Sequence, residues 1–279
     1  MKKAWMNGVN CQTISILDRG LAYGDGLFET LLYTSGQIVL LEAHLARLQA
    51  GAERLRLPFA LDVLQNELQS FLCEAEAEGL LGHSGAAVVK IILSRGIGGR
   101  GYAFPQDQSA SQRVLMLFDH PSYSCSNRDE GVAIRFCDTP VSVNTALAGL
   151  KHLNRLDSVM ARNEWSDPHI VEGLMLDDGG FVIEGTMSNL FIVKDDVLIT
   201  PLLHRAGVEG VMRAHVLNLA DQHKVETRIK VNLRTEQLLD ADEVFICNSV
   251  FGVWPVTQLE SKQWPVGMLT QAFQRWMGS

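Results

Sequence analysis

The order of strand-like and helix-like segments constrains the fold of this chain most. In the first third, short apolar segments joined by turn residues come before two long stretches with helical spacing. Strand-like and helix-like segments also mix in the rest of the chain, without the strict alternation that a doubly wound parallel sheet requires. We therefore expect an α+β fold with mixed sheets and helices.

Hairpins followed by helices are predicted in the first third. Asn7-Gly8 is typical of a tight hairpin turn, and Ser35-Gly36 separates two further strand-like runs. Leucine and alanine then recur with helical spacing until Pro58 ends the pattern. The elements expected here are strands at 28–33, 37–41, 86–94 and 114–118, and helices at 41–55 and 61–77.

Residues 119–128 divide the chain into two predicted domains. This segment contains a proline and several serines and shows no periodicity, which is typical of a linker. A chain of 279 residues is long enough for two domains. We expect a smaller domain at 1–118 and a larger one at 129–279. The elements expected beyond the linker are strands at 132–136, 174–176, 181–184, 189–194, 197–200, 225–231 and 243–247, and helices at 153–165 and 211–222.

Composition excludes several classes of protein. The net charge of −8 gives no basic field for gripping nucleic acid. The five cysteines are odd in number and form no C-x-x-C pair, which argues against a zinc ribbon or a disulfide framework, and no metal is expected. No long apolar run follows the N-terminal lysines or occurs elsewhere. We expect a cytoplasmic protein that binds neither membrane nor nucleic acid.

Two glycine-containing segments were candidates for anion binding. The loop 96–101 is followed by Tyr102-Ala103-Phe104-Pro105, which does not start a helix, so the loop is not predicted to bind a nucleotide. A functional loop and a merely flexible connection are equally good interpretations of this segment. Gly207-x-x-Gly210 is followed at once by a helical pattern, whose first backbone N–H groups, at 211 and 212, would be unpaired. The alternative there is an ordinary helix start.

Lys151 is a candidate for catalysis, and Glu184 is a candidate for a buried functional carboxylate. Among eight lysines, only Lys90 and Lys151 lie in apolar surroundings. Such surroundings favour the neutral amine, which is the form that reacts with carbonyl carbons. Lys90 could instead extend from a strand edge into solvent. Glu184 ends an apolar strand and is either a solvent-facing bulge residue or a buried carboxylate that needs a partner.

Several motifs, taken in order, resemble the class IV (fold type IV) pyridoxal-phosphate-dependent aminotransferase family over nearly the whole chain. The matching segments are Asp18-Arg19-Gly20, 23–30, 44–48, 151–155, 184–191, Thr200-Pro201, 206–213 and 241–249. The resemblance implies a fold like that of D-amino-acid aminotransferase, pyridoxal 5′-phosphate as cofactor, and a homodimer. It also implies that the larger C-terminal domain carries the lysine and most of the cofactor site.

The resemblance implies a role for each matching residue. Lys151 holds the cofactor covalently and then acts as the base, while Glu184 pairs with the protonated pyridine nitrogen. Val208 packs on the ring face, and the phosphate is bound by an arginine, a hydroxyl and backbone amides. The implied cofactor-binding set is Arg47, Lys151, Glu184, Asn189, Val208, Val211, Met212 and Ser249.

Two segments, 94–102 and 148–155, are most similar to the lyases of this family that convert aminodeoxychorismate to 4-aminobenzoate and pyruvate for folate biosynthesis. The resemblance makes Arg95 and Arg100 candidates for binding the substrate carboxylates and places Thr30 near the reacting atoms. One alternative is a D-amino-acid or branched-chain aminotransferase of the same fold. Another is a non-catalytic binding protein, against which the combination of Lys151 and Glu184 argues.

Overall fold

The computed structural model describes residues 1–81, 85–105 and 111–278. The chain forms two compact units. The first contains Met1–Pro121 and Lys151–Asn154, and the second contains Ser122–Leu150 and Arg155–Ser279. The boundary at Pro121 falls inside the segment 119–128 that resembles a linker in sequence. Both units combine helices with sheets, so the α+β prediction is confirmed.

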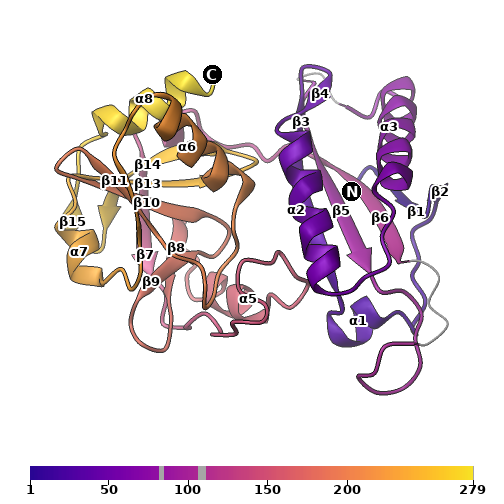
Figure 1. Cartoon of the computed structure of the whole chain (residues 1–279). Coiled ribbons are helices and arrows are strands. Elements are labelled where there is room, and N and C mark those ends of the chain that lie inside the picture. The colour runs from indigo at the N-terminus through magenta and orange to yellow at the C-terminus, as the bar shows by residue number, and fades with distance from the viewer. Residues whose placement is uncertain (82–84, 106–110, 279) are drawn as a thin grey trace. The chain divides into compact units, whose positions relative to one another are not determined.

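The first unit is an antiparallel six-stranded sheet with helices packed along it (Figure 1). Its strands, in spatial order, are β2 (Val9–Asn10), β1 (Lys3–Met6), β6 (Gln112–Asp119), β5 (Ala87–Ser94), β3 (Gly26–Thr34) and β4 (Gln37–Ile38). Its helices are α1 (Arg19–Tyr23), α2 (Leu41–Arg54) and α3 (Leu61–Ala77). The predicted strand 37–41 is shorter because α2 begins at Leu41.

The two faces of this sheet differ in what they carry. Alternate residues of β3, among them Leu31, are buried on the face covered by α2 and α3. Glu29 lies on this covered face, because its side chain contacts helix α2. Phe28 and Thr30 therefore point to the opposite face, since side chains alternate along a strand. Lys90 is the register partner of Thr30 and shares its face.

Segment 151–154 adds to the edge of this sheet, which corrects the placement of Lys151 in the C-terminal domain. The Phe28 amide donates to the Lys151 carbonyl at 2.9 Å, and the Leu153 amide donates to the Gly26 carbonyl at 3.0 Å. Four residues thus leave the second unit and pair with the start of β3. A local sequence pattern contains no signal for so short an excursion.

The second unit contains a nine-stranded mixed sheet. Its path is β12 (Thr227–Lys230), β11 (Val197–Pro201), β10 (Asn189–Lys194), β13 (Glu243–Asn248), β14 (Gly252–Leu259), β7 (Val132–Phe136), β8 (Ile170–Leu176) and β9 (Val182–Gly185), with β15 (Lys262–Gln263) beside β14. Its helices are α4 (Ser126–Asp129), α5 (Leu156–Arg162), α6 (Val211–Gln222), α7 (Thr235–Leu239) and α8 (Met268–Trp276).

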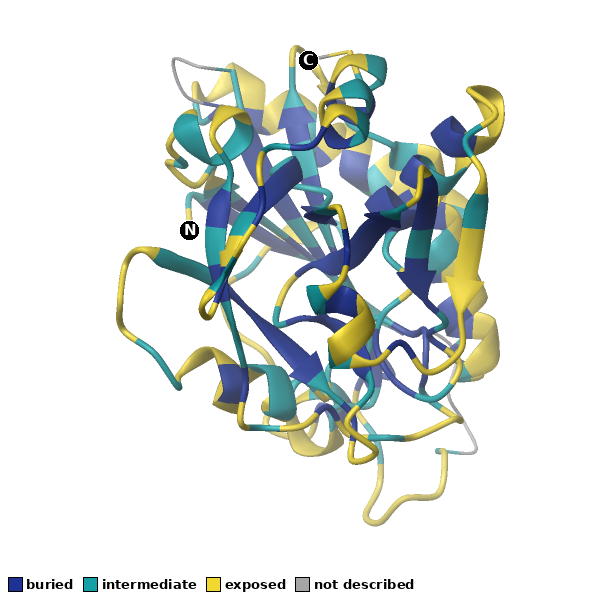
Figure 2. Ribbon diagram, turned by 90° about the vertical axis from the view of Figure 1, so that its left-hand side faces the viewer, coloured by how far each residue is buried: buried dark blue, intermediate teal, exposed yellow. Residues whose placement is uncertain are grey.

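Both faces of the central strands are buried. Phe191 and Phe245 stack with ring centroids 5.0 Å apart on one face, and Phe273 of α8 packs against Phe245. Leu190 and Ile246 belong to the core on the other face. Figure 2 shows the same distribution, with buried residues concentrated in strands and exposed residues in helices and loops. None of the described helices is long and apolar enough to cross a membrane.

Candidate active site

In the first unit, Lys151 lies against an aromatic ring. Its Nζ atom is 4.2 Å from the centroid of Phe28, and Nζ of Lys90 is 5.2 Å from the same centroid. An ammonium group above an aromatic face is attracted by the ring's quadrupole. Phe28, Thr30 and Lys90 project from the same face of the sheet. The two lysines in apolar surroundings, which the sequence separates by sixty positions, therefore share one ring.

Arg47 is held by a buried carboxylate. Nε of Arg47 donates to Glu29 at 2.8 Å, Nη2 makes a second contact with the same carboxylate, and His44 Nδ1 lies 2.7 Å from it. Burial alone would raise the pKa of Glu29, but the charge of Arg47 and the hydrogen bonds from Arg47 and His44 bring that pKa below its ordinary value. The Arg47 side chain is 16% exposed, so it borders solvent.

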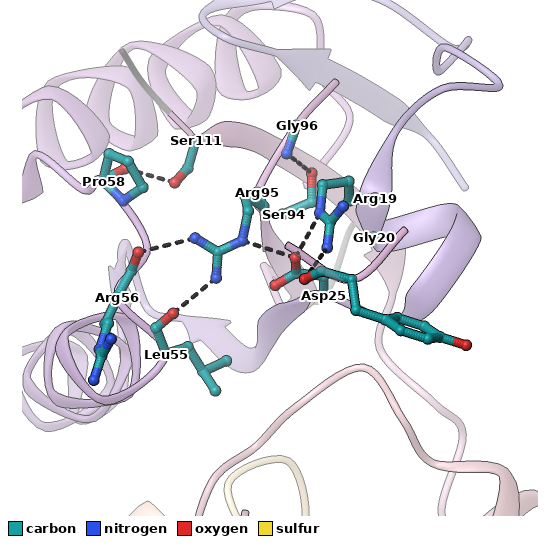
Figure 3. Close-up of polar contacts among 12 residues, drawn as sticks. Arg19, Gly20, Asp25, Leu55, Arg56, Pro58, Ser94, Arg95, Gly96 and Ser111 are labelled. Carbon is teal, nitrogen blue, oxygen red and sulfur yellow. Dashed lines mark hydrogen bonds and ion pairs between the residues drawn. The ribbon is translucent and has the colours of Figure 1, made fainter. Parts of the chain in front are cut away.

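Arg95 has a different environment from the one predicted. It is 2% exposed, and its three nitrogen atoms donate to Asp25 Oδ2 at 2.7 Å, the Leu55 carbonyl at 2.7 Å and the Arg56 carbonyl at 2.9 Å (Figure 3). Arg19 donates to the same Asp25 oxygen at 2.9 Å. This arrangement ties the glycine-rich loop to helices α1 and α2. It gives Arg95 a structural role. Arg100 is exposed, and its role toward the substrate stays a prediction.

In the second unit, Glu184 is a buried carboxylate with named donors. It is 6% exposed, which excludes a solvent-facing bulge residue. Its Oε2 atom accepts from the Val208 amide at 2.8 Å and from Asn189 Nδ2 at 3.3 Å. Asn189 Nδ2 also donates to the Val208 carbonyl at 2.9 Å. Three of the predicted cofactor residues are therefore joined by hydrogen bonds.

The start of helix α6 lies beside this group. Gly210 is its N-cap residue, and a Cβ atom there would lie 1.9 Å from Oδ1 of Asn189, so only glycine fits. Within the described residues, no side chain caps this helix. The first amides of an α-helix have no partner within the helix and lie at its positive end. Val211 and Met212 accordingly offer amides for an anion.

Ser249 completes the predicted set of the second unit. It follows β13, whose Cys247 is the register partner of Asn189. Asn248 organises the turn, because its Oδ1 accepts from the Val250 amide at 2.9 Å and from the Phe251 amide at 3.0 Å. Ser249 therefore lies in an ordered turn at the end of the strand that pairs with β10.

The donor set of this unit fits a pyridine ring that carries a phosphate. A buried carboxylate stabilises a protonated ring nitrogen, and the amides at the start of α6, together with a serine hydroxyl, suit a phosphate. The two buried cysteines of this unit are not suited to nucleophilic chemistry, because burial raises the pKa of Cys137 and of Cys247 to about 12. A thiol with so high a pKa is not a nucleophile at neutral pH.

Sequence reasoning assigned no role to Glu29, His44 or Glu172, although all three are buried polar residues. The sequence contains a pattern that could have identified Glu29 and His44. Glu29 lies at a core-facing position of an alternating strand, and His44 lies one position before Leu45 on the buried face of α2. A polar residue at an apolar position of an amphipathic pattern needs hydrogen-bond partners. Nothing local identifies those partners.

Known proteins similar to this chain belong to one family, the class IV aminotransferases. Residues 26–259 match the profile described as "Amino-transferase class IV". An aminodeoxychorismate lyase of Vibrio harveyi is 34% identical over 97% of both chains. A solved structure of 4-amino-4-deoxychorismate lyase from Pseudomonas aeruginosa is 46% identical, covers 98% of this chain and 97% of its own, and has a TM-score of 0.92. A putative branched-chain-amino-acid aminotransferase of Methanocaldococcus jannaschii is 29% identical over 89% of this chain and 83% of its own.

Replacing Arg95 tests its structural role. We expect Arg95→Met to lower the free energy of unfolding by about 3 kcal/mol, because a buried partner of Asp25 is lost. Arg100→Met, in an exposed part of the same loop, should change it by less than about 0.5 kcal/mol. Urea unfolding followed by tryptophan fluorescence measures both. If Arg95→Met is as stable as wild type but binds substrate more weakly, Arg95 has a role in substrate binding instead.

The Glu29 carboxylate should make stability depend on pH. Its folded-state pKa lies below the ordinary value of 4.5, so its contribution is fully present above that value and is lost as the pH falls through the folded-state pKa. We expect the free energy of unfolding of wild type to exceed that of Glu29→Gln by about 3 kcal/mol at pH 7, and by less below pH ~4. Urea unfolding at several pH values, with the exposed Glu42→Gln as control, measures this. A difference that is constant with pH would contradict it.

Proposed function

Because this chain belongs to the class IV aminotransferase family, we propose that it is a pyridoxal-phosphate-dependent lyase. In this proposal it converts 4-amino-4-deoxychorismate to 4-aminobenzoate and pyruvate, a step of folate biosynthesis. The observation that carries the proposal is the similarity, over nearly the full length, to proteins named for this lyase activity. Buried Glu184, with its two donors, supplies the physical support.

The resemblance in sequence gives each residue of the predicted set a role toward the cofactor. Glu184 would pair with the ring nitrogen, and Asn189 keeps that carboxylate oriented through its side-chain amide. The resemblance assigns Val208 to the ring face, and a hydrogen bond from its backbone amide holds it next to Glu184. The amides of Val211 and Met212 and the Ser249 hydroxyl would bind the phosphate. The resemblance also assigns Arg47 to the phosphate, and within the first unit Glu29 holds its guanidinium in place.

Lys151 and Thr30 act on the reacting atoms. When bound, the cofactor supplies an electron sink for the carbon that bears the substrate's nitrogen. The Lys151 amine removes the proton from this carbon. The bond from the neighbouring carbon to the enolpyruvyl oxygen breaks, the ring becomes aromatic, and the departing enolpyruvate takes up a proton to give pyruvate. Arg100 supplies positive charge for the substrate carboxylates, and Thr30 lies on the same sheet face as Phe28.

An aminotransferase that acts on D- or branched-chain amino acids is the second candidate. The similarity to the Methanocaldococcus protein supports it, and both reactions begin with removal of the same kind of proton. The two activities differ afterwards, because an aminotransferase reprotonates the cofactor's carbon and expels no leaving group. Assembly as a homodimer and a cytoplasmic location are also part of the proposal, and they rest on the resemblance in sequence.

The direct test compares both activities on one preparation. We expect wild type to release 4-aminobenzoate from aminodeoxychorismate, read by product fluorescence, faster than it transaminates D-alanine or leucine. Lys151→Ala should lose the visible absorbance of the bound cofactor and nearly all turnover. Glu184→Gln should keep the cofactor but lose about 100-fold in turnover, because a neutral amide stabilises a protonated ring nitrogen poorly.

Three results would contradict these assignments. Faster transamination than lyase activity would favour the second candidate. If borohydride still labels Lys151→Ala, the covalent role would belong to Lys90, whose Nζ atom, like that of Lys151, lies over the Phe28 ring. Turnover near that of wild type in Glu184→Gln would show that Glu184 does not face the ring nitrogen.

A further inference from the structure

The carboxylate of Glu172 is buried and surrounded by hydrogen-bond donors. Glu172, on β8, has no solvent-exposed surface. Its Oε1 atom accepts from the Gly173 amide at 2.9 Å, the Thr186 amide at 3.0 Å and the Thr186 hydroxyl at 2.6 Å. Its Oε2 atom accepts from the Met187 amide at 3.2 Å and the Ser188 hydroxyl at 2.7 Å. Four of these five donors belong to the turn 186–188.

This turn connects two residues of the proposed cofactor site. Glu184 is the next-to-last residue of β9, and Asn189 is the first residue of β10. The Gly185 amide donates to the Ser188 carbonyl at 2.7 Å and closes the turn. A Cβ atom on Gly185 would lie 2.8 Å from the Glu172 carboxyl carbon. The carboxylate therefore packs directly against the backbone that follows Glu184.

Both carboxylate oxygens of Glu172 must act as hydrogen-bond acceptors, because all five of these contacts come from donors. An ionised carboxylate only accepts hydrogen bonds, whereas a glutamine side chain would turn an NH₂ group toward the Met187 amide or the Thr186 amide. Burying a charge is costly unless hydrogen bonds offset the loss of water. Among the described residues, no cationic side chain pairs with Glu172, so neutral donors provide that compensation. A turn that needed only closure would not require a buried charge.

We propose that Glu172 is a positioning residue of the cofactor site, which fixes Glu184 and Asn189 by holding the turn between them. The inference rests on the proposed function, because that function gives Glu184 its role toward the ring nitrogen. A carboxylate that must face a ring nitrogen tolerates a displacement of only about 0.5 Å. Thr186 and Ser188 transmit the constraint, since their hydroxyls and the Thr186 amide bind the carboxylate from the turn.

The same unit contains a matched control. Glu243 accepts from the Leu269 amide at 3.0 Å, the Thr270 amide at 2.9 Å and the Thr270 hydroxyl at 2.9 Å, and so anchors the start of α8. The two carboxylates use the same kind of contact, a threonine amide and hydroxyl. No residue of α8 is assigned to the cofactor or the substrate. Thr186→Val and Thr270→Val therefore each remove a hydroxyl that donates to a carboxylate, and only the first of these hydroxyls adjoins the site.

The experiment uses both variants as holoenzymes, at saturating pyridoxal phosphate and with 4-amino-4-deoxychorismate as substrate. We expect Thr186→Val to lower kcat about ten-fold, with KM changed less than two-fold, because a hydrogen bond to a charged group is lost. The visible absorption maximum of the bound cofactor should also shift. In urea unfolding, Thr270→Val should lose about as much stability as Thr186→Val. Its kcat and the absorption spectrum of its bound cofactor should stay unchanged.

Glu172→Gln and Glu243→Gln repeat the comparison at the carboxylates, with larger expected effects. Equal losses of kcat in the two threonine variants, or no loss and no spectral shift in Thr186→Val, would overturn the positioning role. If wild type binds the cofactor but lacks lyase activity, the proposed function fails. The spectrum and the affinity for pyridoxal phosphate then still distinguish Thr186→Val from Thr270→Val. If Glu172→Gln does not fold, the threonine pair decides the question.

Discussion

The hydrogen bond from the Val208 amide to Glu184 is the contact on which the arrangement of the second unit's site depends. It joins the end of β9 to the connection that leads into α6, and Asn189 links the same two places through its side-chain amide. The buried carboxylate and the start of the helix are therefore fixed relative to each other. A ligand with a cationic ring nitrogen and a phosphate needs this fixed separation, because neither group of the ligand can move independently.

Carboxylates that are buried or, in the case of Asp25, half-buried order separate segments within each unit. Glu29 holds Arg47 and His44, Asp25 holds Arg19 and Arg95, and Glu172 holds the turn 186–188. Each carboxylate connects segments that are separate in sequence. Their burial strengthens these contacts, since the local dielectric constant is lower than in water, and it also makes a lost partner costly.

The sequence predicts elements well where periodicity is strong and local. The helices at 61–77 and 211–222 and the strands at 132–136 and 189–194 have the bounds expected from their apolar spacing. Helix α5 is shorter than the predicted 153–165 because residues up to Asn154 pair with the first unit. Strand β14 and helix α8 were not predicted, and both depend on contacts with β13. β14 pairs with β13 as a hairpin in which Asn248 opposes Gly252, but Pro255 inside β14 removes a backbone donor and weakens the strand pattern in the sequence.

The three arginines considered for ligand binding show why site residues are harder to predict than elements. Arg95 and Arg100 lie five positions apart in one glycine-rich loop, and their local sequences suggest the same role. Arg95 is buried with three protein acceptors, whereas Arg100 is exposed, and Arg47 lies between these extremes. A guanidinium whose three nitrogen atoms all donate to protein acceptors stabilises the fold at the expense of ligand binding. The acceptors that decide this for Arg95, at residues 25, 55 and 56, come from segments far from the loop in sequence.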